Sequence, residues 1–131
     1  MLTGHAAAND AGSPGSTVAT LCVWLEHDPA SPVRSHSTPG EDLDTVVNIR
    51  TVFQQDLHQL NFTAMLTLLR PPVGRYGRCD YEKMFCADLK RGEDIFELRG
   101  INRTAGYIVI ERPDQYVGHI LPLSNRDKLA T

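Results

Sequence analysis

The sequence lacks the features that mark several large classes of protein. Its three cysteines, Cys22, Cys79 and Cys86, form an odd and sparse set, which argues against a secreted disulfide scaffold. No apolar run approaches the ~20 residues that a membrane-spanning helix needs. The first sixteen residues lack the basic start and apolar centre of a signal peptide. A net charge of −3 gives no concentrated basic surface for nucleic acid. We therefore expect a cytoplasmic protein that binds neither membrane nor nucleic acid.

Motifs for cofactor and metal chemistry are also missing. Flavin binding in a strand–turn–helix needs a Gly-x-Gly-x-x-Gly turn, where backbone amides approach the pyrophosphate, and the chain has none. The five histidines never take the His-x-x-x-His spacing of a helical metal site. A zinc site would need His119 to meet Cys79 or Cys86 in space, and an exposed or interface role for His119 is favoured instead. We expect no cofactor, metal or catalytic residue in this chain.

The cysteines do not favour redox chemistry either. Thiol–disulfide exchange usually needs Cys-x-x-Cys at the start of a helix, where the helix dipole lowers the pKa of the thiol. Cys79 and Cys86 lie seven positions apart in an irregular segment, and Cys22 lies inside an expected helix. We interpret all three as structural cysteines.

What is present indicates one α/β domain. The chain has 131 residues, 41% of them hydrophobic and 22% charged, which suffices for a single core. Residues 1–16 are rich in Ala, Gly and Ser and are expected to form a flexible leader. The domain is then expected to occupy residues 17–131.

Periodicity predicts the elements of the first half. Val18, Leu21, Cys22 and Leu25 recur at helical spacing, so a helix is expected over 17–27, capped by Ser16, ended by Asp28-Pro29, and with Trp24 packed against a sheet. Residues 29–40 are expected to be a loop. Residues 46–53 alternate as a strand, with Val47, Ile49 and Phe53 on one face. A second helix is expected from Asn61 until Pro71-Pro72 breaks it.

The second half combines an irregular segment with a hairpin. Residues 73–99 give no clear periodicity, and such a long segment is usually functional or an interface element. Two β-rich runs, 107–111 and 116–121, flank Pro113-Asp114, whose residues suit the centre of a tight turn. Ser124-Asn-Arg-Asp127 has the pattern of a capping box, which predicts a last helix cut off after about two turns.

Several segments, taken in order, carry a resemblance that no single one would support. They are Asp28–Val33, Gly40–Asp44, Val52–Gln55, Gly74–Gly77, Asp80–Lys83, Asp94–Phe96, Arg112–Val117 and Leu121–Leu123. From residue 17 onward the chain resembles the carboxy-terminal domain of the phenol 2-monooxygenase family of FAD-dependent aromatic hydroxylases, which includes 3-hydroxybenzoate 4-monooxygenase-like members. The resemblance implies a thioredoxin-like fold that contributes to dimerisation, and FAD and NADPH as cofactors of the parent enzyme.

The expected elements leave one strand of that fold unaccounted for. A thioredoxin-like domain begins with a strand before its first helix, and here that position holds residues 6–15, which have no β character. We therefore expect an α/β, thioredoxin-like domain that lacks its first strand and is truncated in its last helix. Its sheet would have three strands and an open edge.

Six residues are the candidates for contact with a partner. Tyrosine and arginine often anchor protein contacts, and the candidates are Arg75, Tyr76, Tyr81, Arg112, Tyr116 and His119. In the alternative, the charges of the first loop are satisfied internally, with Arg75 or Arg78 paired to Asp80 or Glu82. Alternatively, Arg112 has a structural role and pairs with Asp114 across the turn.

The leading functional hypothesis is a non-catalytic domain for dimerisation or docking within a FAD- and NADPH-dependent aromatic hydroxylase. Its partner would be a second copy or the FAD and substrate domains of the same enzyme. One alternative is a stand-alone thioredoxin-like protein that is redox-active or binds glutathione. Another is a free-standing binding module derived from a longer gene.

Overall fold

The computed structural model describes residues 2–6, 17–42, 47–54, 58, 67–88, 90–92, 94–102 and 105–130. The elements, in chain order, are β1 (Leu2–Ala6), α1 (Thr17–His27), α2 (Pro32–Ser35), β2 (Ile49–Phe53), a 3-10 turn (Thr67–Leu69), β3 (Pro72–Val73), β4 (Arg78–Cys79), β5 (Met84–Cys86), α3 (Ile95–Leu98), β6 (Tyr107–Glu111) and β7 (Val117–Pro122).

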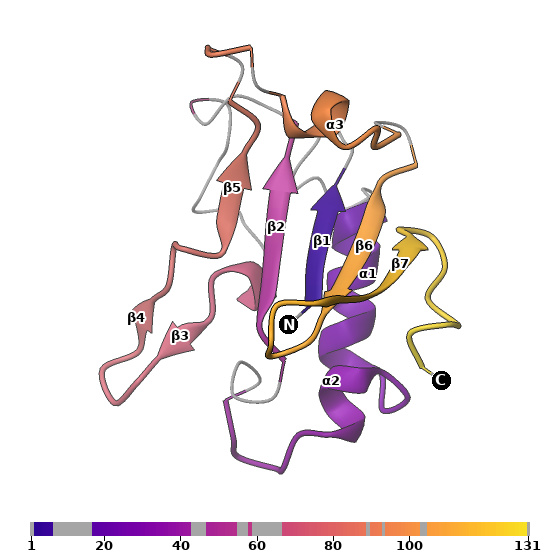
Figure 1. Ribbon diagram of the computed structural model, residues 1–131. Coiled ribbons are helices and arrows are strands. Elements are labelled where there is room, and N and C mark those ends of the chain that lie inside the picture. The colour runs from indigo at the N-terminus through magenta and orange to yellow at the C-terminus, as the bar shows by residue number, and fades with distance from the viewer. Residues whose placement is uncertain are drawn as a thin grey trace.

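Five of the strands form one mixed sheet in the order β5-β2-β1-β6-β7. β1 and β2 run parallel, as do β2 and β5, whereas β6 is antiparallel to both β1 and β7. The parallel pair is joined across one face of the sheet by the connection that contains α1 (Figure 1). This arrangement is the predicted α/β, thioredoxin-like fold, with β5 added beyond β2.

The prediction that the domain lacks its first strand is wrong. β1 lies at the centre of the sheet, and Gly4 pairs with Thr51 of β2 on one side and Ile108 of β6 on the other. The segment Leu-Thr-Gly-His-Ala has weak strand propensity, but backbone pairing on both sides overrides propensity. Residues 2–6 are therefore not part of a leader, and residues 7–16 lie outside the described part of the chain.

α1 occupies the predicted residues and buries the predicted stripe, including Leu21, Cys22 and Leu25. It ends where Asp28-Pro29 was expected to end it: the Asp28 N–H still donates to the Trp24 carbonyl at 2.9 Å, and the Asp28 carboxylate then accepts from the N–H of Ala30 at 2.8 Å. Trp24 packs against the core, as predicted. The expected cap, Ser16, is outside the described residues.

The expected loop over residues 29–40 contains a single helical turn, α2. Ser31 is buried, and its hydroxyl accepts from the N–H of Arg34 at 3.2 Å and donates to the Leu25 carbonyl at 2.7 Å. A serine cap followed by Pro32 at the first helical position favours helix initiation. The same hydroxyl thereby fixes α2 to the end of α1.

The strand expected over 46–53 is observed as β2, Ile49–Phe53, with Ile49, Thr51 and Phe53 buried and Arg50 exposed. This confirms the predicted alternation. Most of the helix expected from Asn61 lies outside the described residues. Its described end is a 3-10 turn, in which the Arg70 N–H donates to the Thr67 carbonyl at 3.1 Å.

Residues 73–99 hold more regular structure than their sequence indicates. β5 extends the sheet beside β2, through bonds from the Thr51 N–H to Lys83 at 2.8 Å and from the Ala87 N–H to Phe53 at 2.9 Å. The sheet therefore has five strands where three were expected. α3 begins at Asp94, whose carboxylate accepts from the N–H of Phe96 at 2.9 Å.

The helix expected after Ser124 does not form in the described residues, where 123–124 and 127–129 are turns. The N–H of Asn125 donates to Pro122 and that of Leu129 to Arg126, both at 2.9 Å, so the bonds span three residues and not the four of an α-helix. A single turn of α-helix gains few bonds for the residues it fixes, whereas these turns bury Leu123 and Leu129.

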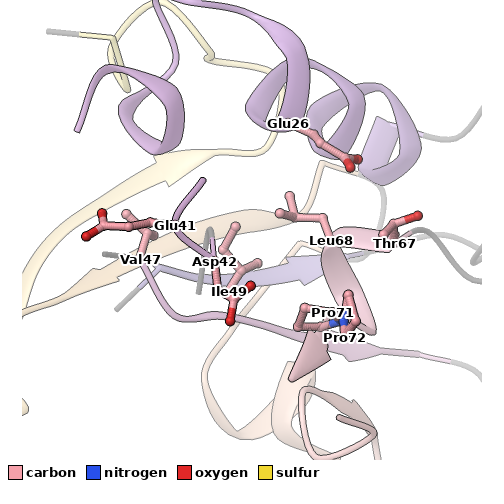
Figure 2. Close-up of a pocket in the computed structure, with 9 residues that line it drawn as sticks. All are labelled: Glu26, Glu41, Asp42, Val47, Ile49, Thr67, Leu68, Pro71 and Pro72. Atoms are coloured by element: carbon pink, nitrogen blue, oxygen red, sulfur yellow. The ribbon is translucent and has the colours of Figure 1, made fainter. Parts of the chain in front are cut away.

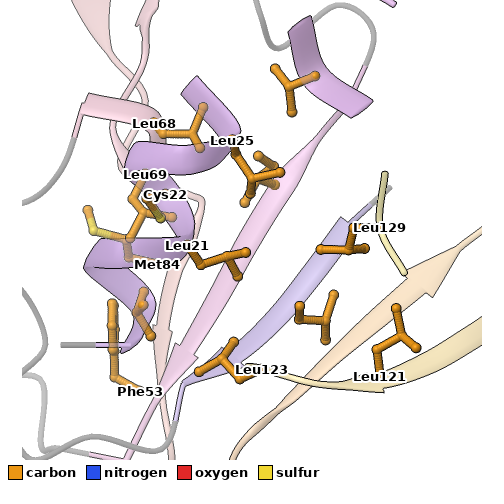
Figure 3. Packing of buried hydrophobic residues seen from close by; sticks show 14 residues of the cluster. Leu21, Cys22, Leu25, Phe53, Leu68, Leu69, Met84, Leu121, Leu123 and Leu129 are labelled. Atoms are coloured by element: carbon orange, nitrogen blue, oxygen red, sulfur yellow. The ribbon is translucent and has the colours of Figure 1, made fainter. Parts of the chain in front are cut away.

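The core lies between α1 and one face of the sheet. Figure 3 shows Leu21 and Leu25 of α1 packed with Phe53, Met84 and residues from the end of the chain. The full buried cluster comprises Val18, Leu21, Cys22, Leu25, Val33, Ile49, Phe53, Leu68, Leu69, Met84, Ile108, Leu121, Leu123 and Leu129. No helix among the described residues is long and apolar enough to cross a membrane.

Candidate interface surfaces

Two of the predicted interface residues lie at the tip of a projecting arm, which we define as residues 72–79. Its strands, β3 and β4, form a separate two-stranded sheet that extends beyond the main sheet (Figure 1). Gly74 and Gly77 have φ of 71° and 59°, values that glycine adopts without strain, and the Gly77 N–H donates to Gly74 at 3.1 Å. This turn presents Arg75 and Tyr76 to solvent, and Tyr76 is 83% exposed.

Tyr81 follows the arm and is also exposed. The backbone there is shaped by Asp80, whose N–H donates to Pro71 at 3.2 Å and whose carboxylate accepts from the N–H of Glu82 at 2.9 Å. The internal alternative for this loop is not formed. Within the described chain no ion pair links Arg75 or Arg78 to Asp80 or Glu82.

The β6–β7 hairpin carries the other three candidates. Arg112 pairs with Asp114 at 3.0 Å, which confirms the predicted pairing across the turn. The Gln115 N–H donates to the Arg112 carbonyl and the Arg112 N–H donates to Tyr116, both at 2.9 Å. Gln115 has φ of 67°, the left-handed conformation that closes a three-residue hairpin. Tyr116 beside it is exposed.

His119 lies in β7 opposite Ile110 of β6, and it is exposed. The structure does not bring it together with a metal-binding set: the described residues contain no group of three His, Cys, Asp or Glu side chains that could hold an ion.

A groove of about 610 Å³ lies on the face of the sheet opposite α1. One wall is the end of α3 and the chain after it, and the floor is β6 with β7. The lining comprises Ile95, Arg99, Gly100, Ile101, Tyr107, Val109, Glu111, Val117 and Ile120. We call these residues the α3–β7 groove.

Sequence analysis placed the hairpin among the candidates but missed the α3 wall. A signal was present in β6, where residues 107–110 are all apolar or aromatic instead of alternating with polar residues. A strand that is apolar on both faces is typical of a sheet covered on both sides. Ile108 faces the core and is fully buried, whereas Val109 on the other face is only half-buried.

A smaller cleft of about 220 Å³ lies between the end of α1, the segment around Glu41 and the residues before the arm. Figure 2 shows Glu26 reaching over it from α1, with Leu68 and Ile49 behind and Pro71 and Pro72 on the opposite side. Among the described residues that line it, the charged ones are the acids Glu26, Glu41 and Asp42. We call it the acidic cleft.

The cysteines lie in different environments and are not disulfide-bonded. Cys22 is buried in the core, and burial, together with the nearby carboxylate of Glu26, raises the pKa of its thiol to about 12. Cys79 is exposed on β4, and Cys86 is half-buried on β5. A thiol with so high a pKa is protonated at neutral pH and is a poor nucleophile.

Comparison with known proteins agrees with this architecture. The chain is 44% identical, over 130 residues, to 3-hydroxybenzoate 4-monooxygenase of Comamonas testosteroni, covering 98% of the chain and 20% of that protein. It is 24% identical, over 102 residues, to the FAD-dependent monooxygenase terD of Aspergillus terreus, covering 76% of the chain and 17% of that protein. The chain thus spans about a fifth of the length of these curated relatives. Residues 2–131 match the family described as phenol hydroxylase, C-terminal dimerisation domain. This chain therefore belongs to the family of phenol hydroxylase C-terminal dimerisation domains.

Proposed function

We propose that this chain is a non-catalytic domain that dimerises or docks within a FAD- and NADPH-dependent hydroxylase of aromatic rings. The observation that carries the proposal is the match of residues 2–131 to a dimerisation domain. An exposed apolar groove and an exposed aromatic arm give such a domain two surfaces for contact. The cytoplasmic location expected from the sequence remains part of the proposal.

The residues of this chain do not fit a flavin site. A flavin pyrophosphate needs several backbone amides converging at a glycine-rich turn between a strand and a helix. Here the left-handed glycines are dispersed over separate turns, at positions such as Gly74, Gly92 and Gly106, and no Gly-x-Gly-x-x-Gly occurs in the sequence. We therefore assign FAD, NADPH and the aromatic substrate to other parts of the proposed enzyme.

The alternative of a stand-alone redox protein has little support. Redox-active thiols usually lie on a helix, and Cys22 is the cysteine that lies on α1. Its side chain is buried, however, and the pKa of its thiol is raised. Cys79 and Cys86 lie on two different strands, in different sheets.

Two measurements test the proposed function. Sedimentation velocity of the purified chain should show a dimer at micromolar concentrations. Titration with FAD should give no saturable binding, because the sequence has no Gly-x-Gly-x-x-Gly turn to supply the amide cluster that a pyrophosphate needs. A concentration-independent monomer would contradict dimerisation and leave docking against the other domains of the enzyme as the function. A flavin retained stoichiometrically through gel filtration would contradict the proposal that the chain is a non-catalytic domain.

A further inference from the structure

The two faces of the β6–β7 hairpin are covered to very different extents. On the face towards α1, Ile108 and Leu121 are 0% and 2% exposed. On the other face Ile120, which pairs with Val109, is 57% exposed, and Val117 is 55% exposed. Both side chains line the α3–β7 groove. Large apolar side chains that gather in a groove at this exposure mark a site of contact with another protein.

The groove also reaches the edge of the sheet. Among the described strands β7 is bonded only to β6, so its outer side leaves backbone donors and acceptors available. Natural proteins usually protect such an edge with charged side chains or cover it. Residues 117–122 carry neither Lys, Arg, Asp nor Glu, so charged side chains do not protect this edge, and a covering partner would do so.

Two of the described residues that line the groove are charged, and their charges have opposite signs. Arg99 lies in the wall that follows α3, and Glu111 lies at the end of β6 in the floor. In a two-fold symmetric contact the same patch meets itself, so each residue faces a different residue of the partner. A patch with one cation and one anion is then self-complementary, because Arg99 of each copy can face Glu111 of the other.

The other two surfaces lack this property. The described lining of the acidic cleft has three carboxylates and no cation, so two copies facing each other there would bring like charges together. The arm presents Arg75 at its tip beside Tyr76, and self-contact at the tip would bring two cations together.

We propose that the α3–β7 groove is the surface on which a second copy of this chain docks, about a two-fold axis that sets Arg99 of one copy against Glu111 of the other. This inference rests on the proposed function, since it names the surface through which the domain would dimerise. Val117 and Ile120 of each copy fill the groove of the partner, and the two charge pairs fix the relative orientation.

Charge reversal in two separate variants tests the geometry. In Arg99→Glu, acids face acids in the homodimer, and in Glu111→Arg, bases face bases. Each variant alone should raise the dimer dissociation constant by about tenfold or more at low salt. An equimolar mixture of the two should regain tight association, because both contacts of the mixed dimer pair an acid with a base. If Arg99 and Glu111 paired only within one chain, mixing the two variants would not restore association.

The matched control is Arg126→Glu, which makes the same charge change at an exposed residue outside the groove lining and should leave the dissociation constant unchanged. Ile120→Ser supplies a second probe that does not depend on charge, and it should weaken the dimer without recovery on mixing. Circular dichroism verifies the fold of each variant, and sedimentation equilibrium gives the constants.

The outcomes separate this inference from the proposed function. If the wild-type chain dimerises but Arg99→Glu, Glu111→Arg and Ile120→Ser all leave the constant unchanged, the groove is not the interface and dimerisation itself stands. If the single charge variants weaken the dimer and the mixture does not recover, the two-fold pairing is wrong. If the wild-type chain is monomeric, this inference fails together with dimerisation, and docking against the other domains of the enzyme is the form of the proposed function that stands.

Discussion

The molecule contains two β-hairpins with similar sequence signals and very different anchorage. β6–β7 has strands of five and six residues, joins the main sheet through β1, and places Ile108 and Leu121 in the core. The arm, β3–β4, has two residues per strand, all of them exposed, and forms a sheet of its own. Glycine or proline turns and tyrosines mark both hairpins. Buried apolar side chains, more than turn chemistry, decide which of them is part of the cooperative fold.

Truncation of the β6–β7 anchor should have the largest effect. Ile108→Ala should lower the free energy of unfolding by about 2–5 kcal/mol, because a fully buried isoleucine leaves a cavity in a packed core. Urea denaturation followed by circular dichroism measures the change. As a control, Val73→Ala in the arm removes apolar atoms from an exposed strand and should change stability by less than about 0.5 kcal/mol. Equal losses in the two variants would contradict the comparison.

The buried and exposed cysteines should also differ in how they change the stability of the fold with pH. Cys22 has a pKa of about 12 in the folded chain against 9.0 for an exposed thiol. At pH values below 9 the thiol is protonated in both states and its burial stabilises the fold fully. Above 9 the unfolded chain releases the proton and the folded chain does not, so this part of the stability is lost as pH rises towards 12.

The loss should amount to about 1.4 kcal/mol for each pH unit above 9. Urea denaturation of the wild type and of Cys22→Ala, compared at pH 8 and pH 10, isolates it: the stability advantage of the wild type should shrink at pH 10. Cys79→Ala, in the exposed arm, should show no such trend. An unchanged difference for Cys22→Ala would show that the thiol is not kept neutral in the core.

A substitution in the β6–β7 turn should have a smaller effect on stability, and of the opposite sign. Gln115→Gly should raise the free energy of unfolding by about 0.5–1 kcal/mol, because glycine relieves the left-handed strain by more than it adds entropy to the unfolded chain. Gly77→Ala imposes similar strain at φ of 59° in the arm, where the added Cβ meets no atom within 4 Å. It should leave global unfolding unchanged, since the arm lies outside the core. Destabilisation by Gln115→Gly would contradict the assignment of strain to that residue.

The sequence predicted those elements that have a periodic apolar pattern or a clear turn signal. α1 and β2 were predicted because Leu21 and Phe53 fall on regular stripes, and the β6–β7 hairpin because two β-rich runs flank Pro113-Asp114. β1 and β5 were missed because they are short and their pairing is decided by neighbouring strands, which leaves little periodic trace. Ser31 was placed in a loop, although its Ser-Pro pair is a recognisable helix start.

The candidate surfaces were predicted less completely than the fold. Arg75, Tyr76, Tyr81, Tyr116 and His119 are exposed residues on or beside the two hairpins. The α3 wall of the groove, with Arg99 and Ile101, could not be found because it faces β6 only after the chain between them has folded back. Long-range proximity of this kind is a property of the topology and not of any local pattern.

The arm gives the smallest expected effect and the sharpest separation between the two hairpins. In Arg75→Ala with Tyr76→Ala, both side chains are removed from an exposed turn, and the free energy of unfolding should change by less than about 0.5 kcal/mol. Self-association should also be unaffected if the second copy docks in the α3–β7 groove. Sedimentation equilibrium, with circular dichroism to verify the fold, measures both. A weakened dimer with unchanged unfolding would instead make the arm the interface, because only a side chain at the contact can alter association while leaving the core intact.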